Sequence, residues 1–162
     1  MKHHLGLLLV LIIAACNSQN NTTNANNPTA NIDLKAVLPG TWETLAFRVN
    51  INTFQNTDST FVMEVQPGEW ETKMQTRPIL TEYRSDNRYT STYRNLSDSL
   101  LRTERGIWNV FGDTLMLVSP EATYQYEVIQ KEGNLQFRSV LDWDGDGIED
   151  DEYIGTQKFI KK

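Results

Sequence analysis

The amino-acid sequence predicts an all-β protein: a single antiparallel up-and-down β-barrel of about eight or nine strands, preceded by a short helical turn. Short stretches of alternating, β-branched or aromatic residues follow one another from residue 34 to residue 162. Turn-forming pairs such as Pro67-Gly68 and Gly112-Asp113 separate these stretches, and a helical turn is expected only at residues 32–38. Many sequential strands leave exposed edges unless the sheet closes, so a barrel is the expected arrangement.

Nine strands are expected because each segment alternates with period two or is rich in β-branched and aromatic residues. In the first, Leu45, Phe47, Val49 and Ile51 would share one face. Short connections predict antiparallel pairing of neighbours along the chain. The expected strands are residues 41–51, 60–65, 79–84, 88–94, 99–111, 114–118, 123–130, 134–142 and 152–160.

The first fifteen residues have the pattern of an export signal. Lys2 lies before an apolar run from Leu5 to Ala15, which is too short to cross a bilayer as a helix. The quartet Ile13-Ala14-Ala15-Cys16 resembles the lipobox of bacterial lipoproteins. The resemblance implies that Cys16 carries the fatty acyl chains, palmitate among them, and begins the mature protein. The alternative is a soluble secreted protein with a chance Cys at its cleavage site.

An Asn-rich segment separates Cys16 from the expected barrel. Residues 17–33 contain seven Asn and no aromatic residue, so a disordered tether is expected over residues 16–33. The predicted organisation is a signal peptide at residues 1–15, the lipidated tether at 16–33 and one barrel domain at 34–162. We therefore expect a lipid-anchored protein of the bacterial cell envelope, with the outer membrane as its membrane.

Two motifs within the domain resemble one family. Gly40-Thr41-Trp42 after a helical turn resembles the opening of lipocalins. The segment from Gly106-Ile107-Trp108 to Gly112-Asp113-Thr114-Leu115-Met116-Leu117 is similar to a hairpin of bacterial lipocalin-like lipoproteins. The resemblance implies an eight-stranded barrel. In lipocalins a basic side chain near the last strand packs over the first Trp, a role for which Arg138, Lys158 and Lys161 are the candidates here.

The family further implies an apolar pocket for a small apolar or amphipathic ligand inside the barrel. The aromatic candidates for its lining are Trp42, Phe47, Phe61, Tyr83, Trp108 and Phe137. The alternative is a filled barrel, because side chains often occupy the interior of small barrels. The protein would then be a structural or interaction module that contacts proteins or glycans.

An acidic segment near the C-terminus predicts a calcium site. Residues 142–152 contain seven acidic residues and no basic one. Acids at positions one, three and five, with Gly at six, are typical of a calcium loop. The expected ligands are Asp142, Asp144, Asp146, the carbonyl of Ile148, Asp150 and Glu152, with Asp151 as an alternative to Glu152 because position twelve is Tyr153. The other interpretation is a solvated acidic hairpin tip.

Composition excludes several other functions. His3 and His4 are the only histidines and precede the expected cleavage site, so the mature chain has no imidazole for catalysis or for a zinc site. Many Asp and Glu residues could supply a catalytic pair of carboxylates, but the sequence does not indicate which two would lie together. No enzymatic activity is therefore expected. No basic patch with interleaved aromatic residues indicates nucleic-acid binding. A monomer is expected.

Overall fold

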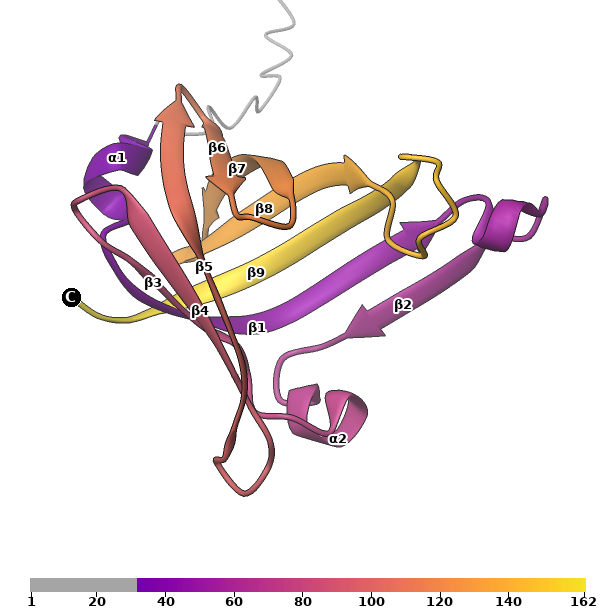
Figure 1. Cartoon of the computed structure of the whole chain (residues 1–162), viewed down its shortest axis with the longest axis horizontal. Coiled ribbons are helices and arrows are strands. Elements are labelled where there is room, and N and C mark those ends of the chain that lie inside the picture. The colour runs from indigo at the N-terminus through magenta and orange to yellow at the C-terminus, as the bar shows by residue number, and fades with distance from the viewer. Residues whose placement is uncertain (1–31) are drawn as a thin grey trace, which may run out of the picture.

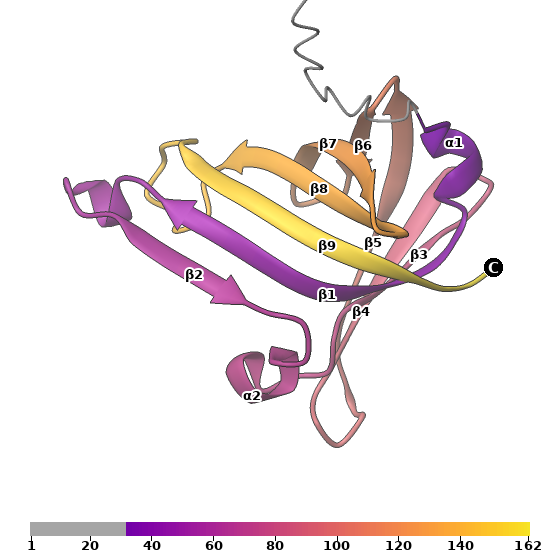
Figure 2. The ribbon, with the colours of Figure 1, turned by 180° about the vertical axis from the view of Figure 1, so that it is seen from behind.

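The computed structural model describes residues 32–162, which form one antiparallel sheet of nine strands (Figures 1 and 2). Eight of them, β1 and β3 to β9, close into a barrel because β9 pairs with β1, while β2 is an additional strand. The expected fold class is therefore confirmed. The strands are β1 (Gly40–Ile51), β2 (Phe61–Val65), β3 (Leu80–Tyr83), β4 (Arg88–Arg94), β5 (Leu100–Phe111), β6 (Thr114–Val118), β7 (Thr123–Lys131), β8 (Asn134–Leu141) and β9 (Asp151–Lys161).

The helices are short. The expected turn is α1 (Leu34–Val37), in which the Asp33 carboxylate accepts a hydrogen bond from the backbone N–H of Ala36. Ile32, which begins the helical turn expected at residues 32–38, packs partly buried against the core. Two helical segments were not expected: η1 (Phe54–Asn56) and α2 (Trp70–Met74). Within residues 32–162, no helix combines the length and apolar character that a membrane span requires.

Strand β1 is shared between three neighbours. Its first part, Gly40 to Glu43, pairs with β3, its second part, Phe47 to Ile51, pairs with β2, and β9 runs along its other edge. Consecutive pairing therefore fails only between β2 and β3, because the chain passes through α2 before it rejoins the barrel (Figure 2).

A bulge in β1 corrects the expected alternation. The pairing of β1 with β9 shifts register between Thr44 and Ala46. A bulge inserts one extra residue into β1, so Trp42, Thr44 and Phe47 are all buried although Phe47 does not follow Thr44 at a spacing of two. Leu45, which the period of two would place with Phe47, belongs to neither buried cluster.

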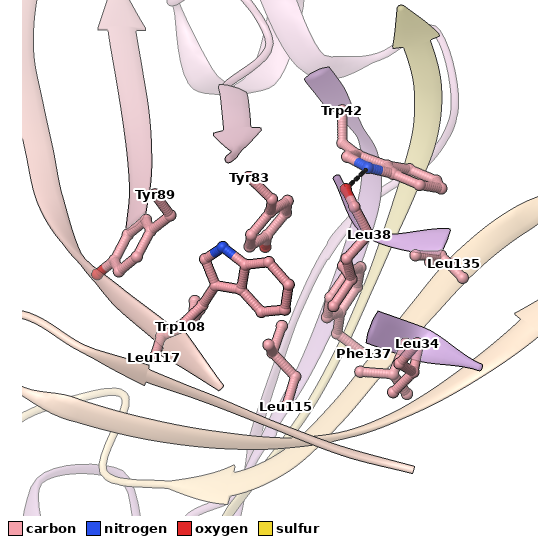
Figure 3. Packing of buried hydrophobic residues seen from close by; sticks show 11 residues of the cluster. Leu34, Leu38, Trp42, Tyr83, Tyr89, Trp108, Leu115, Leu117, Leu135 and Phe137 are labelled. Carbon is pink, nitrogen blue, oxygen red and sulfur yellow. Dashed lines mark hydrogen bonds between the residues drawn. The ribbon is translucent and has the colours of Figure 1, made fainter. Parts of the chain in front are cut away.

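The larger core cluster lies where α1 meets the barrel (Figure 3). Leu34 and Leu38 are fully buried there, in the same cluster as Trp42 and Trp108. Both indole N–H groups are satisfied: Trp42 donates to the Leu38 carbonyl at 2.9 Å and Trp108 to the Arg84 carbonyl at 3.0 Å. The cluster comprises Leu34, Leu38, Trp42, Tyr83, Tyr89, Trp108, Leu115, Leu117, Val128, Leu135 and Phe137.

The neighbour of Trp42 differs from the lipocalin expectation. Phe159 of β9 packs edge-on against the indole, with ring centroids 5.3 Å apart. Lys158, one of the basic candidates for this position, instead pairs with Glu43 at 2.6 Å. In the described part of the chain, the only cation over an aromatic ring is Arg102, which lies over Tyr93.

The smaller cluster lies under β2 and α2. Phe47, Val49 and Ile51 of β1 meet Val65 and Trp70 there. Phe47 and Trp70 pack edge to face at 5.6 Å. The second half of β1 is thus covered by an extra strand and a helical turn, and a space remains between the two clusters.

Candidate functional site

A cavity of about 590 Å³ occupies the barrel interior between the two clusters. Tyr83, Tyr89, Leu117 and Phe137 border it on the side of the larger cluster, and Trp70 and Met74 border it on the side of α2. Small-molecule sites typically measure about 300 to 1,000 Å³. The interior of this barrel therefore has room for a small molecule.

The structure distributes the six expected pocket residues over three environments. Phe47, Tyr83 and Phe137 line the cavity. Trp42 and Trp108 are buried within the larger cluster and are not among the lining residues. Phe61 is 53% exposed on β2, outside the barrel. Sequence reasoning selected the large aromatic residues and passed over the polar ones.

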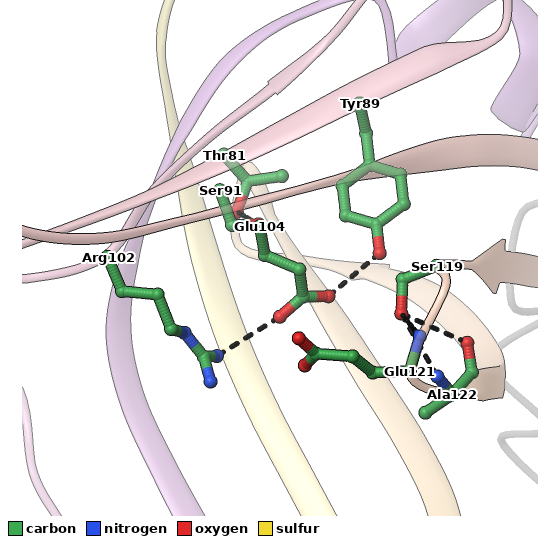
Figure 4. A network of polar contacts seen from close by, with 8 residues as sticks. All are labelled: Thr81, Tyr89, Ser91, Arg102, Glu104, Ser119, Glu121 and Ala122. Atoms are coloured by element: carbon green, nitrogen blue, oxygen red, sulfur yellow. Dashed lines mark hydrogen bonds and ion pairs between the residues drawn. The ribbon is translucent and has the colours of Figure 1, made fainter.

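A polar network faces the cavity from β3, β4 and β5 (Figure 4). The Tyr89 hydroxyl donates to one carboxylate oxygen of Glu104 at 2.8 Å, and the Arg102 guanidinium donates to the other at 3.1 Å. Arg102 also lies 4.4 Å from the centroid of the Tyr93 ring. The hydroxyls of Thr81 and Ser91 are hydrogen-bonded at 2.9 Å.

The cavity is rich in tyrosines that remain neutral. Burial is the main cause that raises the pKa of Tyr83, Tyr126 and Tyr153, the last to about 12. Burial also raises the pKa of Tyr89, and its hydrogen bond to Glu104 adds to the effect. The phenols therefore offer the interior neutral hydroxyl groups and ring faces.

The acidic segment between β8 and β9 forms a compact loop. One carboxylate oxygen from each of Asp142, Asp144 and Asp151 lies within 4.8 Å of the others, so the three side chains can hold a metal ion. Asp151, the first residue of β9, is only 1% exposed. The loop is folded around its first acid, because Asp142 accepts hydrogen bonds from the backbone N–H groups of Gly145, Asp146 and Gly147.

The other four expected ligands have partners elsewhere: Asp146 and Asp150 contact the connection from β1 to β2, Ile148 bonds within the acidic loop, and Glu152 contacts β1. Asp146 accepts the backbone N–H of Asn56 at 2.8 Å, and Asp150 accepts the Thr53 hydroxyl at 3.0 Å. Ile148 donates its backbone N–H to Asp146. Glu152 accepts the side-chain amide of Asn50 at 3.1 Å. Of the six expected ligands, the structure thus brings Asp142 and Asp144 together, and it joins them with Asp151, the expected alternative to Glu152.

Trp143 connects the acidic loop with the cavity. Its ring stacks on Tyr153 at 5.7 Å and lies 5.6 Å from Phe47. Trp143 and Asp142 both line the cavity. The cavity and the candidate metal group are therefore adjacent parts of one region.

Comparison with known proteins identifies no family: no protein-family model matches the chain, and a search of curated proteins finds no significant relative. The expected signal peptide at residues 1–15, the expected lipidation site Cys16 and nearly all of the expected tether lie outside the described residues.

Proposed function

We propose that this protein is a lipid-anchored lipoprotein of the bacterial cell envelope whose lipocalin-like barrel binds a small apolar or amphipathic ligand without catalysis. The observation that carries the proposal is the cavity of about 590 Å³ inside the barrel. A filled barrel, as expected of a purely structural module, would leave no such space. The quartet ending at Cys16 supports the anchor, with the outer membrane as the expected location and a monomer as the expected state.

A cavity-filling variant tests ligand binding. Thr81 is 4% exposed and lines the cavity, whereas Thr92 faces outward on β4, between the inward-facing Ser91 and Tyr93. Thr81→Phe should weaken binding of a fluorescent apolar probe at least tenfold because its ring occupies the space, while Thr92→Phe should bind the probe as the wild type does. Circular dichroism of both variants establishes that they fold. Unchanged probe affinity in a folded Thr81→Phe variant would contradict binding inside the barrel.

Fractionation tests the anchor separately. Cys16→Ser removes the only thiol in the chain. We expect the wild-type protein to sediment with membranes and the variant to remain in the soluble fraction. A variant that still sediments with membranes rules out lipidation at Cys16 as the anchor.

The acidic loop supports a second role, binding of a calcium ion that stabilises the β8–β9 connection. Asp142, Asp144 and Asp151 carry this proposal, because hard cations favour several carboxylate oxygens within a small space. With a dissociation constant of about 1 mM, as in weak extracellular sites, 10 mM calcium would increase the free energy of unfolding by about 1.4 kcal/mol. The midpoint of thermal unfolding should then rise by about 4 to 8 °C.

Two variants separate a bound ion from screening of charge. Asp144→Asn should abolish the calcium-dependent rise in the midpoint, whereas Asp113→Asn, the same change in the turn between β5 and β6, should retain it. Sodium chloride at equal ionic strength should not reproduce the rise. Equal midpoints in calcium and in chelator would rule out the calcium site.

A further inference from the structure

The barrel interior has two chemically different walls. Five polar side chains form what we call the polar belt: Thr44, Thr81, Ser91, Glu104 and Gln157. They come from five strands that are adjacent around the barrel, β9, β1, β3, β4 and β5. All five line the cavity.

Strand register makes this belt continuous. Thr44 pairs with Gln157, Thr81 pairs with Ser91, and Ser91 pairs with Glu104. Trp42 is the partner of Thr81, so Thr44 lies diagonally next to Thr81 on the same face. Directly opposed residues have Cβ atoms about 5 Å apart and diagonal neighbours about 7 to 8 Å apart, so the five polar side chains follow one another around one side of the cavity.

One member of the belt has an unused hydrogen-bonding group. The side-chain oxygen of Gln157 is buried and, among the described residues, has no hydrogen-bond partner. A buried acceptor without a donor costs on the order of 1 to 3 kcal/mol. A hydroxyl group on a bound molecule would supply that donor.

The facing wall, formed by β6, β7 and β8, is apolar and aromatic. Leu117, Tyr126 and Phe137 come from these three strands, and Tyr126 packs edge to face with Phe137 at 6.0 Å. Ring faces favour a flat apolar or aromatic molecule. The strands of the belt also contribute aromatic rings, among them Phe47, Tyr83 and Tyr89. The cavity therefore suits an apolar or aromatic ring system with a polar group that can reach the belt.

The charged side chains around the cavity disfavour binding of an anionic ligand. Arg102 is the only cation among its lining residues, and the Glu104 carboxylate and the Tyr93 ring already bind it. Asp142 adds a second carboxylate. A ligand carboxylate would face two acids, and the one base that lines the cavity is already paired with one of them.

We propose that the cavity selects a neutral amphiphile, an apolar or aromatic ring system that carries a hydroxyl group, and that Gln157 accepts the hydrogen bond of that hydroxyl. The inference rests on the proposed function, binding of a small molecule inside the barrel. It goes further because it excludes the carboxylate analogues that an open apolar cavity would also accept.

Three probes with the same ring system test the proposal: naphthalene, 2-naphthol and 2-naphthoate. Their affinities are measured at pH 7 by titration of the full chain carrying Cys16→Ser, which keeps covalently bound lipid out of the sample. We expect 2-naphthol to bind about two- to tenfold more tightly than naphthalene, as one hydrogen bond provides, and 2-naphthoate to bind most weakly. Gln157→Leu should remove the advantage of 2-naphthol over naphthalene. Gln125→Leu, the same change at an exposed position of β7, should retain it.

The outcomes distinguish the two proposals. If none of the probes binds, the proposed function itself is contradicted. If all three bind equally, or if Gln157→Leu keeps the preference for 2-naphthol, the barrel binds apolar molecules but the polar belt does not select them. Glu104→Gln provides an independent check, because removal of this negative charge should strengthen 2-naphthoate binding, and an unchanged affinity for 2-naphthoate would contradict the electrostatic part.

Discussion

Asp151 joins two loops that lie far apart in the sequence. One of its carboxylate oxygens accepts the backbone N–H of Trp143 at 2.7 Å, and the other accepts that of Asn52 at 3.2 Å. The side chain is 1% exposed, so these N–H groups have little access to water as a substitute. A single buried carboxylate therefore fixes both the acidic loop and the connection from β1 to β2.

Replacement of Asp151 should be costly even without a metal. Asp151→Ala leaves the backbone N–H groups of Trp143 and Asn52 without partners, so we expect the free energy of unfolding to fall by about 2 to 5 kcal/mol. Glu149→Ala, an exposed acid of the same loop, should change it by less than about 0.5 kcal/mol. Urea unfolding at pH 7 in the presence of chelator measures both. A loss no larger than that of Glu149→Ala would show that the carboxylate does not hold the loops together.

At the scale of single residues, the sequence predicted part of the acidic site. Asp142 and Asp144 follow from the spacing of acids before a Gly, which depends on local geometry alone. Asp151 was expected only as an alternative ligand, because its inward direction is set by the start of β9 and by Asn52, 99 residues away. Long-range pairing of this kind leaves no mark on the local spacing. The polar belt was likewise missed, since Thr, Ser and Gln on a barrel face look like solvent-facing residues.

Gly106 of β5 lies against the backbone of Val118, the last residue of β6. A Cβ atom at this position would overlap the Val118 carbonyl oxygen and would lie 2.6 Å from the Tyr89 ring. The carbonyl belongs to the neighbouring strand, so it can move only if the sheet moves with it. The Gly of the Gly-Ile-Trp motif is thus required by the distance between two strands.

Gly106→Ala should consequently destabilise the barrel by at least about 1 to 3 kcal/mol, the usual cost of an overpacked interior. Arg105→Ala changes the exposed neighbouring residue and should leave the midpoint of thermal unfolding nearly unchanged. Thermal unfolding of the two variants, followed by circular dichroism, gives the comparison. Equal midpoints would mean that the strands at this point can separate without cost.

At the scale of elements, both ends of all nine strands were predicted to within one residue, because periodicity and turn residues are local signals. Three features were not predicted from the sequence: the bulge in β1, the helical turns η1 and α2, and the position of β2 outside the barrel. The bulge depends on pairing with β9, and α2 forms where Trp70 fills the space beside Phe47. All three are set by tertiary packing, which overrides the local pattern.

At the scale of the whole molecule, the buried tyrosines couple stability to pH. Tyr83, Tyr126 and Tyr153 come from β3, β7 and β9, so their ionisation charges the interior from several sides. Burial raises the pKa of each in the folded protein above the value of about 10 in the unfolded chain. A raised pKa in the folded state stabilises the protein below pH 10. This stabilisation is lost as the pH rises from 10 through the folded-state pKa, because only the unfolded chain ionises there.

We therefore expect steep alkaline unfolding above pH 10. Each such tyrosine lowers the free energy of unfolding by about 1.4 kcal/mol per pH unit above pH 10. Tyr153, with its pKa raised to about 12, therefore accounts for a loss of roughly 3 kcal/mol between pH 10 and pH 12. Urea unfolding at pH 8, 10 and 11 measures the decline in the free energy of unfolding. Tyr153→Phe should make this decline shallower by the contribution of one proton, about 1.4 kcal/mol per pH unit. Tyrosinate absorbance should show these phenols ionising only as the barrel unfolds. If they ionise near pH 10 while circular dichroism remains native, water reaches them in the folded state, and the interior is then too wet for selection of an apolar ligand.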